Sequence, residues 1–146
     1  MKWQLATNLR FEDLQVGQAV THSVKISDAL IEAYAELTGD HHPLHTDKNY
    51  AGVHGFKDRI AHGALITSLS SKIIGMDLPG EGTILLNQSS EYLKPVFPGD
   101  CLAFRATITH LKKSLRLVTV GIEVENQVSD IVSLQEFSIK IREPLS

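Results

Sequence analysis

The chain has 146 residues, of which 42% are hydrophobic and 21% are charged, and its formal net charge is -3 at pH 7. This length allows one domain with a full core and is short for two, so we expect a single domain over residues 1–146. Nucleic acids and anionic membranes attract basic patches, and the mild negative charge therefore argues against both partners. Cys101 is the lone cysteine, which excludes an intrachain disulfide and a thiolate metal site. Residues 1–11 show no secretory core and no apolar run is long enough to span a bilayer, so we expect a cytoplasmic protein.

The first elements are a strand and an amphipathic helix. Residues 18–26 end in alternating polar and apolar side chains, which indicates a strand. Ser27 is a good helix N-cap, and Gly39 supplies a stop. Between them, apolar residues recur at helical spacing: Leu30, Ala33, Tyr34 and Leu37.

Two segments of different character follow this helix. Residues 38–61 contain two turn signals and little periodicity, so we expect an irregular segment with one helical turn around residues 47–51. Irregular segments of this length inside compact domains usually carry function. Residues 63–76 are apolar or small on every side, and Lys72 is their only charge. This pattern predicts a helix that is buried all round.

Four strand-like runs complete the chain. Residues 83–93 have a polar middle, whereas residues 102–109 and 118–125 alternate as in an antiparallel sheet with one buried face. In residues 132–141 the apolar phase switches, which predicts a β-bulge near Gln135-Glu136. We therefore expect an α+β domain in which an antiparallel β-sheet wraps around a central buried helix.

Asp40 and His45 lie five residues apart, immediately after the predicted helix stop. A carboxylate polarises a water molecule and a near-neutral imidazole returns a proton, so this pair is a candidate for acid–base catalysis. His62-Gly63 opens the buried helix, whose free backbone N–H groups can face a developing oxyanion. Together these groups indicate chemistry beside a carbonyl. The alternative is that Asp40 only forms an Asx turn before Pro43 and that His45 is a surface histidine.

Other kinds of site are possible on the same residues. Histidines concentrate in one segment, which raises a metal site as an interpretation: His41, His42, His45, His54 and His62. Their spacing lacks the helical i, i+4 pairs of histidine zinc sites, so we expect no metal and no other cofactor. Ser70 and Ser71 either bond back to their own helix or reach the site as donors. Nucleophilic catalysis is not expected, because Ser71 lacks a Gly-x-Ser-x-Gly elbow and Cys101 has no nearby histidine.

The segment from Tyr34 to Ala51 resembles the hydratase signature of the MaoC-like, (R)-specific enoyl-CoA hydratase family, and further matches extend over roughly residues 11–141. The matching residues are Tyr34, Leu37-Thr38-Gly39-Asp40, Pro43-Leu44-His45, Ala51, Ile60-Ala61-His62-Gly63 and Pro95-Val96-Phe97-Pro98-Gly99-Asp100. One position departs from the signature, because His42 stands where the family has Asn.

This resemblance implies a hot-dog fold, usually a homodimer, whose partner is an acyl-CoA or an acyl-carrier-protein thioester. It implies that water adds reversibly across a trans-2-enoyl thioester to give an (R)-3-hydroxyacyl thioester. Asp40 and His45 would be catalytic, and the Gly63 N–H would bind the thioester oxygen. His62 and Ser71 would lie beside the substrate, and the loop would be braced at His42-Pro43. Two other activities remain open, since a shared fold does not fix chemistry. A hot-dog thioesterase would release free thiol, and a non-catalytic acyl-thioester binding module would bind without turnover.

Overall fold

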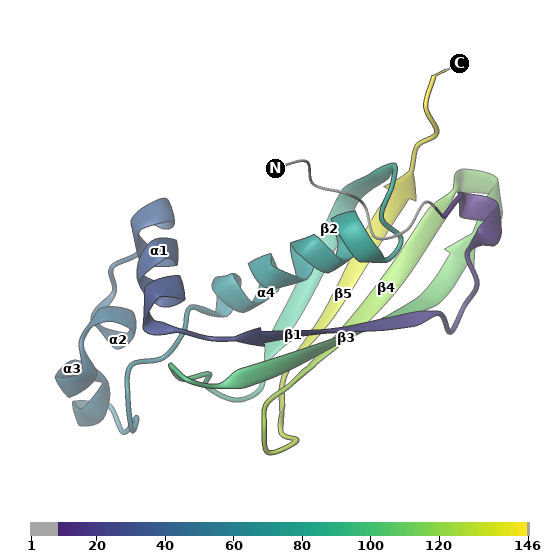
Figure 1. Cartoon of the computed structure of the whole chain (residues 1–146). Coiled ribbons are helices and arrows are strands. Elements are labelled where there is room, and N and C mark those ends of the chain that lie inside the picture. Colours follow the sequence, from purple (N-terminus) through teal and green to yellow (C-terminus); the bar gives the residue numbers. More distant parts are fainter. Residues whose placement is uncertain (1–8, 146) are drawn as a thin grey trace.

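The computed structural model describes residues 9–145, in which five strands form one antiparallel sheet in the order β1-β3-β4-β5-β2 (Figure 1). The strands are β1 (Ala19–Lys25), β2 (Thr83–Tyr92), β3 (Cys101–Lys112), β4 (Leu117–Glu125) and β5 (Ile131–Ile141). Helix α4 (Gly63–Lys72) lies across one face of the sheet, and α1, α2 and α3 gather beyond one end of it. This is the predicted α+β, hot-dog arrangement. Residues 1–8, which belong to the stretch predicted to have no secretory core, and residue 146 lie outside the described residues.

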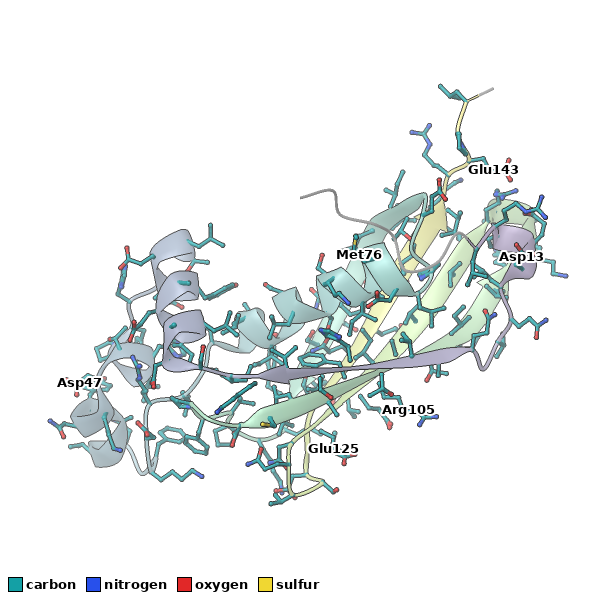
Figure 2. The ribbon with its side chains drawn as sticks, in the orientation of Figure 1. Asp13, Asp47, Met76, Arg105, Glu125 and Glu143 are labelled. Atoms are coloured by element: carbon teal, nitrogen blue, oxygen red, sulfur yellow. The ribbon has the colours of Figure 1, made fainter. Side chains whose placement is uncertain are left out.

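The core lies between α4 and the sheet. Alternate side chains of β3 and β4, such as Phe104, Ile108 and Val120, are fully buried, as the period of two along a strand requires. Arg105, between two buried positions of β3, projects from the side of the sheet that faces away from α4 (Figure 2). Among residues 9–145, no helix combines the length and apolar character needed to cross a membrane.

Helix α1 (Asp28–Thr38) begins and ends where the capping residues predict. The Ser27 hydroxyl oxygen accepts a hydrogen bond from Leu30 N at 3.1 Å. Gly39 ends the helix with φ of 76°, a left-handed conformation that glycine adopts without steric cost. The turn at Gly39 directs the chain straight into Asp40.

The segment after Gly39 contains more helix than the single predicted turn. It forms α2 (Pro43–Thr46) and α3 (Lys48–Val53). Asp47 caps α3, because its Oδ1 accepts hydrogen bonds from Asn49 N and Tyr50 N at 2.8 and 3.1 Å. Figure 2 shows Asp47 at the end of the molecule opposite Asp13, which belongs to a short 3-10 helix, Phe11–Asp13.

Helix α4 is not buried all round, which corrects the prediction. It continues as one π-helical turn over Ile73–Asp77. Leu65, Ile66 and Ser70 are buried, but Ala64, Ser68 and Ser71 are exposed. The reason is that the sheet covers only one side of the helix. Small residues on the other side resemble core residues in composition and yet remain accessible in the single chain.

The β-bulge of β5 lies at Val132, not near Gln135-Glu136. Glu125 pairs with Ile131 and Val124 pairs with Ser133, so that Val132 is the extra residue. From Ser133 onward the odd-numbered residues face α4, and Leu134 faces away with 40% exposure. The buried Gln135 explains why the apolar pattern was misleading, because its amide has a partner in the core. A 3-10 helix, Lys113–Leu115, joins β3 to β4.

Candidate active site

Three predicted site residues converge between α1, α2 and α4. Asp40, His45 and His62 each offer one side-chain ligand atom, and these atoms lie within 4.8 Å of one another. The imidazole rings of His45 and His62 stack with centroids 3.8 Å apart. His62 is only 3% exposed, whereas the Asp40 side chain is 53% exposed. The cluster therefore has a buried floor and an open carboxylate.

The ring of His45 is held by the backbone of the loop that precedes α4. Its Nδ1 lies 2.7 Å from Ile60 O, and Ile60 N donates in return to Leu44 O at 2.9 Å. A carbonyl oxygen only accepts, so Nδ1 carries the hydrogen and Nε2 of the neutral ring keeps a lone pair. Burial lowers the pKa of His45, the hydrogen bond to Ile60 opposes this shift, and neighbouring His62 lowers the pKa further. His45 is therefore neutral at pH 7, with Nε2 ready to accept a proton.

The two carboxylate oxygens of Asp40 differ in their surroundings. Oδ1 accepts a hydrogen bond from His42 N at 3.2 Å, so the Asx turn predicted as the alternative interpretation is present. Oδ2 lies 4.0 Å from His62 Nε2 and has no closer partner among residues 9–145. A structural role and an open oxygen are thus combined in one side chain.

His62 lies behind the pair and holds it in place. Its Nε2 donates to the backbone oxygen of Asp40 at 2.9 Å. Its Nδ1 is buried and has no hydrogen-bond partner in the described part of the chain. The ring of Tyr34 also packs against it, with centroids 5.0 Å apart and planes inclined by 58°. Through one ring, His62 fixes the backbone at Asp40 and the plane of His45.

His42 caps α2 through its ring. Nδ1 accepts a hydrogen bond from Leu44 N at 3.2 Å, and Pro43 occupies the first helical position, where its fixed φ suits a helix. Nδ1 is bonded to the same side-chain carbon position as the Oδ1 of an asparagine. The histidine therefore supplies the acceptor that an N-cap asparagine supplies.

The loop before α4 is tied down on both sides. Arg59 forms ion pairs with Asp28 at 2.5 Å and with Glu32 at 3.1 Å, both on α1. Ala61 N donates to Val96 O at 2.8 Å, which joins the loop to the segment after β2. These contacts fix the carbonyl of Ile60, which in turn orients His45.

A cavity of about 360 Å³ opens beside His45 and Gly63. Its walls are mainly apolar and include Phe56, Ile60, Ile66, Pro95 and Val96. Gly63 is the first residue of α4, so its N–H has no intrahelical partner, and no described residue accepts a hydrogen bond from it. The ring of Tyr92 packs on Gly63 so closely that an added Cβ would lie 3.1 Å from it.

The remaining predicted residues lie elsewhere. Ser71 is exposed on α4 and is not among the residues that line this cavity. Ser70, on the buried side, donates to Gln135 Oε1 at 2.6 Å. His41 lies near Glu36 at 3.8 Å, and His54 stacks on Tyr50. The five clustered histidines thus do not form one site.

A metal ion finds few free ligand atoms here. Asp40, His45 and His62 are the group of described residues close enough to share one. However, His62 Nε2 is committed as a donor to the Asp40 carbonyl. A donor N–H has no lone pair to offer a metal, so the arrangement suits a water molecule better than a cation.

Sequence reasoning missed Tyr92 and the carbonyl of Ile60. No side-chain pattern marks a backbone carbonyl, and Tyr92 meets Gly63 only through the fold. The polar middle of residues 83–93 was the one available signal, since Ser90 and Tyr92 both contact Thr67.

Comparison with known proteins identifies relatives of the chain. Residues 12–130 match the family model described as MaoC like domain. The (R)-specific enoyl-CoA hydratase of Aeromonas caviae is 33% identical over 130 residues, which cover 89% of this chain and 97% of the relative. The enzyme of the same name from Rhodospirillum rubrum is 38% identical over 109 residues, covering 75% and 76%. The solved (R)-hydratase structure from A. caviae has a TM-score of 0.86 at 33% identity and covers 90% of this chain and 99% of its own.

Proposed function

The chain belongs to the MaoC-like domain family, and from this we propose that it interconverts trans-2-enoyl-CoA and (R)-3-hydroxyacyl-CoA by reversible addition of water. One observation carries the proposal for its catalytic residues. Asp40 and His45 present side-chain atoms within 4.8 Å of each other, and His45 lines an apolar cavity. One water molecule can bridge two atoms at this separation, because each of its hydrogen bonds spans about 2.8 Å.

His45 acts first as an acceptor. With its Nδ1–H held by Ile60 O and its pKa lowered by burial, the resting ring is neutral and offers Nε2. Asp40 Oδ2 accepts the other hydrogen of the same water and raises the electron density on its oxygen. Activation by two acceptors therefore needs no metal and no organic cofactor.

The atoms of one water account for the whole addition. Its oxygen forms the bond to C3 of the enoyl thioester, while one of its protons moves to His45 Nε2. His45 then returns that proton to C2, and the proton near Asp40 stays on the new hydroxyl group. Both residues end in their starting state, which is required for turnover in either direction.

The enolate oxygen that forms during the addition needs a donor. The Gly63 N–H is unpaired at the N-terminus of α4, a ten-residue helix with its positive dipole end at this point. The ring of Tyr92 packs over Gly63, and both residues line the cavity. The thioester carbonyl is proposed to bind there.

Three further residues act through this pair. His62 positions Asp40 and His45 through the stack and the hydrogen bond described above. His42 and Pro43 brace the loop as the cap and first residue of α2. For Ser71, whose side chain is exposed in the single chain, substrate contact remains a prediction from the resemblance.

The free edge of β2 supports a homodimer. β2 is the last strand of the sheet, and an unpaired edge of this length favours pairing with a second copy. Its exposed apolar residues include Ile84, Leu85 and Leu86 at 40, 52 and 57%. We also propose that residues 1–146 form one such domain in the cytoplasm, consistent with a free, exposed Cys101.

Hydration of crotonyl-CoA tests the function. We expect loss of the enoyl-thioester absorbance without release of free thiol, and the product should be the (R)-3-hydroxyacyl-CoA. Free thiol without that loss would instead show a thioesterase, and binding without turnover would show a non-catalytic module.

A further inference from the structure

A wall of polar side chains borders the cavity on the side of β2 and β5. Two cross-strand pairs of this wall, Ser90 with Gln135 and Tyr92 with Ser133, lie opposite each other in the register. Opposite residues of an antiparallel pair point to the same face, which here is the face covered by α4. Tyr92 and Ser133 also line the cavity.

Helix α4 contributes hydroxyl groups to the same wall. Thr67 Oγ1 lies 2.9 Å from Ser90 Oγ and 2.7 Å from the Tyr92 hydroxyl. These bonds hold the Tyr92 ring in place over Gly63. Thr67 lies four residues after Gly63, which corresponds to about 6 Å along α4 at about 1.5 Å per residue.

The hydrogen bonds of Gln135 have a defined direction. Ser70 Oγ lies 2.6 Å from Gln135 Oε1, and this short distance suits an O–H···O bond better than an N–H···O bond. The amide nitrogen of Gln135 therefore faces Ser133, and it donates to Ser133 Oγ at 3.3 Å. All three residues of this chain of hydrogen bonds are buried, with exposures of 0, 1 and 5% for Ser70, Ser133 and Gln135. The direction of the hydrogen bonds is therefore set by contacts in the core and not by solvent.

Ser133 consequently has a hydroxyl hydrogen to give. Its oxygen accepts from Gln135, and its own O–H finds no acceptor among residues 9–145. The other polar side chains that line the cavity already have partners for their hydrogen-bond donors: Lys94 pairs with Asp130 at 2.7 Å, the Tyr92 hydroxyl bonds to Thr67, and the Nδ1–H of His45 bonds to Ile60 O. Apart from the backbone N–H of Gly63, which is assigned to the thioester oxygen, Ser133 thus offers the cavity a buried and unused side-chain donor.

We propose that Ser133 is a specificity-determining residue, and that the cavity selects enoyl thioesters whose acyl chain carries an oxygen substituent beyond C3. The inference rests on the proposed hydration and names its substrate class. A plain alkyl chain would displace water from Ser133 and leave the hydroxyl without a partner. A hydroxyl or keto oxygen on the chain accepts this hydrogen bond, and sites built for such a bond discriminate strongly against analogues that lack it.

The test compares four thioesters on the full-length protein. They are trans-2-hexenoyl-CoA and its 4-, 5- and 6-hydroxy derivatives. We expect at least one hydroxylated substrate to exceed the unsubstituted one in kcat/KM by tenfold or more, mainly through a lower KM. In Ser133→Ala this ratio should fall tenfold or more. Because both substrates meet the same enzyme sample, the ratio does not depend on the fraction that is folded.

Ser138→Ala is the matched control, because Ser138 lies on the same strand and faces away from α4. It should leave the ratio unchanged. Preference for the unsubstituted chain, or a Ser133→Ala ratio equal to that of wild type, overturns the inference while the hydratase function stands. Hydration of none of the four thioesters by wild type overturns the proposed function and the inference together.

Discussion

The imidazole rings of His45 and His62 stack with centroids 3.8 Å apart and planes inclined by 25°. His45 lines the cavity, whereas His62 is buried against Tyr34. Burial is the main reason that a positive charge on His45 is disfavoured, and neighbouring His62 adds to it, so the pKa of His45 is lowered from 6.5. His62 therefore contributes to the neutral state of His45, although it is not among the residues that line the cavity.

His62→Gln should move the acid limb of the pH profile. In wild type, kcat/KM should fall as the pH drops through the pKa of His45, which lies below 6.5 because burial disfavours the charged ring. Removing the His62 ring takes away one cause of this shift and admits water, so the limb should move to higher pH. The measurement is kcat/KM for crotonyl-CoA between pH 5 and 8.

His54→Gln is the control for that experiment, since His54 stacks on Tyr50 outside the cluster. An acid limb at the same pH in wild type and His62→Gln would show that His62 does not influence His45.

His42→Asn should retain or raise activity. Asparagine restores the family signature and keeps an acceptor for Leu44 N at the start of α2. His42→Ala removes that acceptor and should lower the free energy of unfolding by about 1 kcal/mol. Turnover and thermal unfolding of both variants would be compared. A tenfold loss in His42→Asn, matched in wild type by a chelator, would revive a metal site.

Gly63→Ala should damage the oxyanion site. The added Cβ would lie 3.1 Å from the Tyr92 ring, and Tyr92 is held by its hydrogen bond to Thr67. We expect kcat/KM to fall about tenfold, equivalent to 1.4 kcal/mol of barrier. Gly75→Ala has open space around the new Cβ and should be neutral. If adding Tyr92→Ala to Gly63→Ala restored activity, the contact with the Tyr92 ring would be confirmed. Normal activity of Gly63→Ala would show that the Tyr92 ring moves aside without cost.

Leu86→Lys should weaken the proposed dimer. It places a charge on the exposed edge strand β2, where Leu86 is 57% exposed in the single chain. Light scattering should give twice the chain mass of 16.1 kDa for wild type and a lower mass for the variant. Val128→Lys, in the turn between β4 and β5, should remain dimeric. A monomeric wild type at micromolar concentration would contradict the dimer.

Local signals predicted the features that depend on neighbouring residues. Ser27 and Gly39 marked both ends of α1, because capping depends on residues within one turn. Asp40 follows this turn and precedes His45 by five residues. The structure brings the two side chains together. The alternation of apolar residues also predicted an antiparallel sheet with one buried face, although not the order of its strands.

Long-range contacts were beyond such signals. The stack of His62 on His45 depends on how the loop before α4 is tied to α1. The bulge at Val132 lies before Gln135, whose buried amide oxygen accepts a hydrogen bond from Ser70 in the opposite layer. The exposed side of α4 looked like core in composition, because small residues are compatible with both environments. Each of these features is set by a contact between residues far apart in sequence.

The central claim is that Asp40 and His45 share one water molecule. The most direct test follows the enoyl-thioester absorbance of crotonyl-CoA with wild type, Asp40→Asn, His45→Gln and the double variant, with circular dichroism to confirm the fold. Each single change should lower kcat by about 100-fold or more, because it removes one acid–base group. The double variant should be no slower than the slower single variant, since groups that act as a unit are non-additive. Near-normal hydration by both single variants, or losses that multiply in the double variant, would contradict the account.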